Sequence, residues 1–115
     1  MAEIIYKIVP EALWRAAEKS GRFDGAPVDL QDGFIHFSTA IQVGETAARH
    51  FAGKAGLLLV AVDAGRLGTA LKFETSRGGA LFPQLYAPLD PAAILWAAPQ
   101  PLRADGGHDF PDLGN

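Results

Sequence analysis

The run Leu57-Leu58-Leu59-Val60-Ala61-Val62 is the longest apolar stretch of the chain, and it predicts the central β-strand of the fold. Successive side chains of a strand point to opposite faces, so an uninterrupted apolar run is apolar on both faces. Such a strand has to be covered on both sides by other elements. The stretch is far too short to cross a bilayer, which makes it a core strand rather than a membrane segment.

Working outward from this strand, shorter β-branched and aromatic runs predict four more strands, at residues 4–9, 33–37, 70–75 and 94–97. The segment 82–86 contains Pro83, which cannot donate a hydrogen bond within a ladder, so we expect it to be irregular or at a sheet edge.

Two helices are expected in the first half of the chain. Pro10 suits a first helical turn, and Ser20-Gly21 suits a helix end. The second helix should follow a cap at Ser38 or Thr39, with a buried stripe of Ile41, Ala48 and Phe51. Because strands outnumber helices, the predicted class is α+β: a mixed, mostly antiparallel sheet with two helices packed on it.

Three segments predict irregular structure. Residues 21–32 are rich in glycine, proline and acids, and a loop of that length is often a functional lid. Residues 76–79, Ser-Arg-Gly-Gly, predict a flexible loop. Residues 99–115 hold several prolines and glycines and predict a loosely packed tail on a single domain that spans 1–115.

Composition narrows the classes of function. The 115 residues carry a net charge of −3 and no cysteine. The basic residues are scattered, which argues against nucleic acid as a partner and leaves a small-molecule ligand as the expectation. Missing cysteines suit the cytoplasm, and no signal-like or membrane-spanning stretch is evident. The three histidines, His36, His50 and His108, lack metal-ligand spacing, so no metal is expected.

His36 is the first candidate for a functional side chain, because it is the one polar residue in the apolar run 34–37. Ser38 should point to the same side, and Thr39 should begin the capped helix. A helix N-terminus beside a histidine can hold an anion and move a proton near neutral pH. The alternative is a buried histidine bonded to a backbone carbonyl.

Glu74 and the segment 82–86 supply the other candidates. Glu74 ends a predicted strand, where its carboxylate can act as a base or pair with Lys72 or Arg77 on the surface. Phe82, Gln84 and Tyr86 alternate, so an extended segment aims all three to one side. Such a set forms either a surface for a ring-containing ligand or a lid on the core.

The runs Asp32-Gly33-Phe34-Ile35-His36-Phe37-Ser38-Thr39 and Phe82-Pro83-Gln84-Leu85-Tyr86 resemble the signature of a bacterial and plant family. The family is known only as a domain of unknown function, number 952, and the resemblance covers nearly the whole chain. Its pattern usually has histidine where this chain has Gln84. If that histidine is a catalytic base, this chain lacks it; if it only donates a hydrogen bond, glutamine can substitute.

The family is in turn distantly similar to the ADP-ribosyltransferase-like fold, which implies NAD as a substrate. By this resemblance His36 and Ser38 hold the nicotinamide ribose, Tyr86 stacks on the ring, and Glu74 is the catalytic carboxylate. The alternative is a non-catalytic module that binds a small ligand or a partner through His36, Thr39, Phe82 and Tyr86. A third reading, an RNA 2′-phosphotransferase, is disfavoured by the acidic net charge.

Overall fold

The computed structural model describes residues 3–75, 79–111 and 113, so most of the loop expected at 76–79 lies outside the described residues. Within the described part, the strands and helices follow in this order: β1 (Ile4–Pro10), α1 (Glu11–Ser20), α2 (Pro27–Asp32), β2 (Ile35–His36), β3 (Ser38–Thr39), α3 (Val43–His50), β4 (Leu57–Asp63), β5 (Leu71–Thr75), β6 (Leu81–Leu85) and β7 (Ile94–Gln100). None of the helices in these ranges is long and apolar enough to span a membrane. The class is α+β, as predicted.

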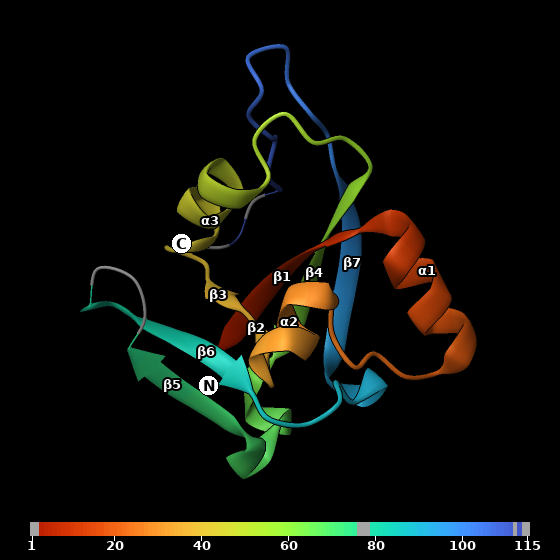
Figure 1. Ribbon diagram of the computed structural model, residues 1–115, viewed down its shortest axis with the longest axis vertical. Helices are drawn as coiled ribbons and strands as arrows, with labels where there is room; N and C mark the ends of the chain where they lie inside the picture. The colour runs from red at the N-terminus through yellow and green to blue at the C-terminus, as the bar shows by residue number, and fades with distance from the viewer. Residues whose placement is uncertain (1–2, 76–78, 112, 114–115) are drawn as a thin grey trace.

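The larger sheet has four strands in the order β3-β1-β4-β7, with antiparallel pairing throughout. β4 lies inside this sheet, and Leu57 to Val62 are all buried, as the apolar run predicts. In Figure 1, α1 lies beside one end of β1. α3 lies next to β3, on the opposite side of the picture from α1. Two apolar clusters cover the two faces of the sheet: Ile5 and Val9 belong to one, and Tyr6 and Ile8 to the other.

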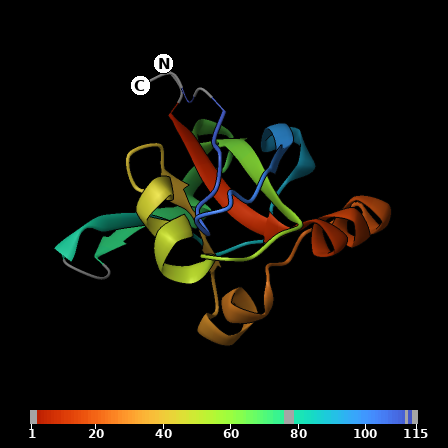
Figure 2. The same ribbon diagram turned by 90° about the horizontal axis from the view of Figure 1, so that it is seen from above.

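The smaller sheet has three strands in the order β2-β6-β5, so the expectation of one sheet is wrong. The run expected as one strand at 33–37 contributes only Ile35 and His36, which pair with β6 in the smaller sheet. Ser38, expected as a helix cap, instead pairs with β1 in the larger sheet, and the chain crosses between the two sheets at the buried Phe37. Figure 2 shows the β5–β6 hairpin projecting from the body on the side opposite α1.

The expectation that residues 82–86 form an irregular or edge segment is also wrong, since β6 is the middle strand of the smaller sheet. Pro83 is tolerated because β2 is only two residues long. The carbonyl of Pro83 accepts a bond from the N–H of Phe37, just past the end of β2. The N–H and C=O of one strand residue point to the same neighbour, so the missing donor costs one bond at the end of the ladder.

The helices differ from expectation in number and position. α2 forms within the predicted loop 21–32, where Pro27 occupies the first turn and Gly33 ends the helix in the left-handed conformation. α3 begins at Val43, later than expected, and buries Val43 and Ala47, while Ile41 is 89% exposed. Of the predicted stripe, Phe51 is half-buried against the cluster of Val43 and Ala47, whereas Ile41 and Ala48 are exposed.

The segment after β7 is more firmly attached than its prolines and glycines suggest. His108 is buried, and its Nε2 lies 2.7 Å from the carbonyl oxygen of Lys54. The N–H of Gly53 donates to the carbonyl of Gly106 at 2.8 Å. Phe110 and Leu113 also pack against the apolar cluster that contains Tyr6 and Ile8, so the described residues of the tail are attached by both polar and apolar contacts.

Candidate functional site

A buried carboxylate, Asp29 of α2, organises the candidate site around His36. Its Oδ1 lies 2.6 Å from Nδ1 of His36 and also accepts the backbone N–H of His36 at 3.1 Å. Its Oδ2 accepts the N–H of Ala26 at 2.7 Å and lies 2.9 Å from the ammonium of Lys7 on β1. Lys7 also donates to the carbonyl of His36 at 2.9 Å. Four donors from three elements therefore converge on one carboxylate, and they fix both the ring and the backbone of His36.

Asp29 is charged because its neighbours outweigh its burial. Burial raises the pKa of a carboxyl, but the hydrogen bond from His36 and the charge of Lys7 lower the pKa of Asp29 to about 2. Burial lowers the pKa of Lys7, and the Asp29 carboxylate opposes that effect. The side chain of Asp29 is completely buried and that of Lys7 is 8% exposed, so the pair is a true internal ion pair.

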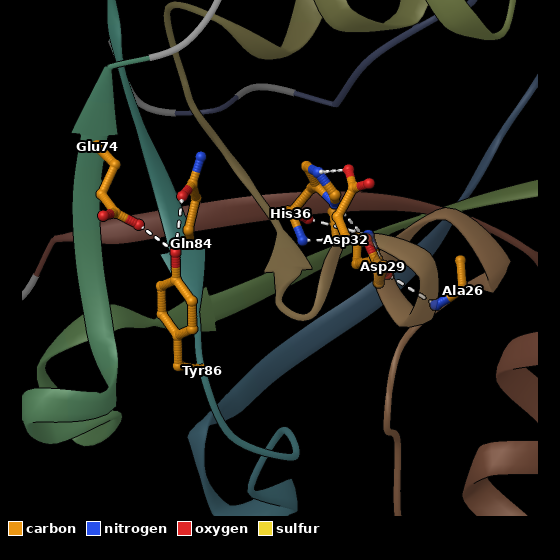
Figure 3. Close-up of polar contacts among 8 residues, drawn as sticks. Ala26, Asp29, Asp32, His36, Glu74, Gln84 and Tyr86 are labelled. Carbon is orange, nitrogen blue, oxygen red and sulfur yellow. Dashed lines mark hydrogen bonds and ion pairs between the residues drawn. The ribbon is translucent and has the colours of Figure 1, made fainter.

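The second ring nitrogen of His36 faces another residue of α2. Its Nε2 lies 3.0 Å from Oδ2 of Asp32, and Figure 3 shows the ring between the two carboxylates of that helix. An imidazole that carries both protons can donate to both carboxylates. Since Asp29 is anchored on Lys7 and His36, α2 is fastened to the site. Residues 27–32 of the expected loop 21–32 are therefore helical.

A cavity of about 500 Å³ opens where the two sheets diverge. It is lined by residues of β1, β6 and α3, by the crossing segment 36–38, and by Val28 and Asp32 of α2. His36, Ser38, Phe82 and Gln84 all line it, so four of the predicted site residues meet in one space. Its mixture of aromatic walls with a few polar groups is typical of a small-molecule site.

Gln84, Tyr86 and Glu74 form a second polar group beside this cavity. Gln84 is opposite His36 in the ladder, and Glu74 is opposite Phe82, so their side chains share one face of the small sheet. The Tyr86 hydroxyl donates to the Glu74 carboxylate and lies 3.4 Å from Oε1 of Gln84 (Figure 3). The Glu74 hydrogen bond raises the pKa of Tyr86. Glu74 therefore forms a hydrogen bond with Tyr86 in this structure. Neither of the two roles that the sequence predicted for Glu74 included this partner.

A second, smaller hollow lies at Tyr86, and none of the residues that line it also lines the larger cavity. The volume of this hollow is about 260 Å³, and both Phe34 and Tyr86 line it. The Phe34 ring lies between two others, with its centroid 4.5 Å from that of His36 and 5.3 Å from that of Tyr86. An aromatic wall thus connects the histidine with the tyrosine–glutamate pair.

The structure contradicts the anion seat expected at Ser38 and Thr39. Both residues are in strand β3, and α3 begins four residues after Thr39 with no side-chain cap. Ser38 lines the cavity, but its hydroxyl lies 2.8 Å from that of Thr46. The Thr39 hydroxyl accepts the N–H of Gln42 at 3.4 Å within a turn. Pairing with β1 holds these residues in the sheet, and the helix starts too late to use them as caps.

Sequence reasoning missed Asp29, Asp32 and Lys7. One signal for Asp29 was present, because Pro27 at the first helical position with an acid two residues later is typical of a helix start. A second signal was Lys7, a single charge inside an otherwise apolar strand, which needs a buried partner. Neither signal shows that Asp29 is the partner of Lys7.

The fold and site together define a class: an α+β protein with two antiparallel sheets and a histidine-centred cavity at their junction. The chain belongs to the family described as a protein of unknown function, DUF952, whose model matches residues 8–97. No curated protein matches the chain.

Solved structures of a Caulobacter crescentus protein, CC0527, are similar to this chain over most of its length. The crystal structure is 52% identical, covers 92% of this chain and 93% of its own, and superposes with a TM-score of 0.89. The solution structure is 53% identical, covers 90% of each chain, and has a TM-score of 0.82. This similarity supports the two-sheet fold, and neither structure's description names an activity.

Proposed function

We propose that this protein binds NAD or ADP-ribose in the cavity and is an ADP-ribosyltransferase-like enzyme. One observation carries the proposal: His36 and Glu74 lie on the same face of the small sheet, and His36, Phe82 and Gln84 of that face line the larger cavity. β6 separates their strands, and Glu74 lies two residues along β5 from Lys72, the residue level with His36. Two strand spacings across the sheet and two residues along it place the two backbones roughly 12 Å apart. A ribose with its attached ring has the size to reach both groups.

In this arrangement the nicotinamide ring occupies the smaller hollow against Tyr86 and Phe34, and its ribose lies beside His36. The bond between ribose C1′ and the nicotinamide nitrogen breaks, and its electron pair neutralises the pyridinium. An acceptor hydroxyl then attacks C1′ and loses its proton. Glu74 stabilises the positive charge on the ribose or takes that proton, after leaving the Tyr86 hydroxyl. Gln84 supplies a hydrogen bond where the family pattern has histidine.

A non-catalytic binding module remains the second candidate, and a specific observation favours it. Asp32, rather than Glu74, is the carboxylate among the described residues that line the larger cavity, and it is engaged with His36. A module of this kind binds the same ligand without cleaving it. The two candidates therefore share a binding test and differ in a turnover test.

The binding test is a thermal-unfolding titration with NAD, ADP-ribose, nicotinamide and phosphate. A ligand at a hundred times its dissociation constant stabilises the folded state by about 2.7 kcal/mol, which raises Tm by several degrees in a domain of this size. We expect NAD or ADP-ribose to raise Tm for the native protein and to lose this effect in His36→Ala. His50→Ala is unsuitable as the control because His50 lines the cavity. Lys19→Met, at the exposed end of α1 and outside the cavity, is the control. The absence of a shift with all four compounds in folded protein would refute the proposal.

A further inference from the structure

The larger cavity has a cationic side that the chemistry at His36 does not use. His50 ends α3, Lys54 follows in the loop before β4, and both line the cavity together with Phe51. In Figure 1, α3 lies on one side of β3 and α2, with Asp32, on the other. The cavity therefore places the Lys54 ammonium just beyond the end of α3, away from the Asp32 carboxylate of α2.

Lys54 is held at the cavity by its backbone. Its N–H donates to the carbonyl of Phe51 at 2.9 Å, and its own carbonyl lies 2.7 Å from Nε2 of the buried His108. His108 lies beyond residues 8–97, the part of the chain that the family model matches. The C-terminal segment thus supports this wall of the cavity.

The Lys54 ammonium is directed to the cavity wall rather than to an acid. Its Nζ lies 5.7 Å from the centroid of the Phe51 ring, and no acid among the described residues pairs with it. Lys7, the other lysine of the cavity, is already neutralised by Asp29. An anionic ligand group that enters beside α3 meets a positive charge without displacing a protein carboxylate.

We propose that Lys54, with His50 beside it, forms a subsite for the diphosphate of a nucleotide ligand. The inference rests on the proposed function, because a ribose at His36 places the linked phosphates along the cavity toward α3. The aromatic side chains of Phe51 and Phe82 border the path between the two groups. The ligand is thereby oriented, with its sugar and ring at the small sheet and its phosphates at the end of α3.

The test is calorimetric titration with ADP-ribose, adenosine and inorganic pyrophosphate. The variant is Lys54→Met, which keeps the chain length and removes the charge. Lys19→Met, at the exposed end of α1, is the matched control. We expect Lys54→Met to weaken ADP-ribose and pyrophosphate by about tenfold or more, the effect of one charge-assisted hydrogen bond, with adenosine unchanged. Added salt should weaken the binding of both anions to native protein.

The outcomes separate the two proposals. If Lys54→Met binds ADP-ribose as tightly as native protein does, the subsite is refuted and nucleotide binding stands. If native protein binds pyrophosphate but not ADP-ribose, and Lys54→Met loses pyrophosphate, the subsite stands and the proposed function falls. If native protein binds neither anion, both proposals are refuted.

Discussion

Oδ1 of Asp29 lies 2.6 Å from Nδ1 of His36 and thereby links helix α2 to the strand that carries the candidate catalytic histidine. The same carboxylate neutralises Lys7, so strand β1, helix α2 and strand β2 meet at one charged group in the interior. The position of His36 therefore depends on an ion pair rather than on apolar packing alone.

Replacing Asp29 by asparagine should lower the free energy of unfolding by about 3 kcal/mol or more, because Lys7 is left as a buried charge without its counter-ion. Urea unfolding of Asp29→Asn measures the change. Asp24→Asn, which disrupts an exposed pair with Arg22, is the control and should cost less than about 1 kcal/mol. Equal losses in the two variants would contradict the role given to Asp29.

Stability in acid should depend on Asp29. Its pKa is lowered to about 2 from 3.8, so its contribution to the free energy of unfolding is complete above about pH 4. That contribution is lost as the pH falls through the pKa of the folded state. Unfolding curves measured between pH 5 and about pH 2 should therefore show a fall in stability that is smaller in Asp29→Asn. Parallel pH profiles would show that Asp29 has an ordinary pKa.

Gly25 is needed for the approach of α2. Its φ is +120°, and a side chain there would place Cβ 2.6 Å from Cβ of Asp29. We expect Gly25→Ala to destabilise the protein by about 1–3 kcal/mol through strain and displacement of Asp29. Gly44→Ala is the control, since Gly44 lies in α3 with open space around it. That variant should be neutral or stabilising by up to about 1 kcal/mol in the same denaturation experiment.

The sequence predicts the strands better than the site, and the reason is physical. β1 and β4 are encoded by local apolar runs, which is information carried within each segment. α2 buries Asp29 rather than an apolar stripe, so no helical periodicity marks it. Its stability comes from Lys7 and His36, which are brought to it by tertiary folding. His36 and Gln84, which the sequence singles out, both line the larger cavity, but the partners that hold His36 could not be assigned without the topology of the fold.

The Tyr86–Glu74 hydrogen bond should be visible in a phenol titration. The pKa of Tyr86 is raised chiefly by its bond to Glu74, and burial raises the pKa of Tyr6, the second tyrosine. In Glu74→Gln one of the two ionisations should move down toward the ordinary value, because the glutamine no longer favours the protonated phenol as a carboxylate does. Ultraviolet absorbance of folded protein follows both groups, and Tyr86→Phe identifies which transition is lost. An unchanged titration in Glu74→Gln would mean that the bond does not persist in solution.

Release of nicotinamide from NAD, followed by chromatography, tests the central claim most directly. The account predicts release by native protein and a rate lower by on the order of a hundredfold in Glu74→Gln, with ADP-ribose binding retained. Glu45→Gln, on the exposed surface of α3, is the control and should keep the native rate. NAD binding without release would leave a non-catalytic module, and release that is equally fast in Glu74→Gln would contradict the catalytic role of this carboxylate.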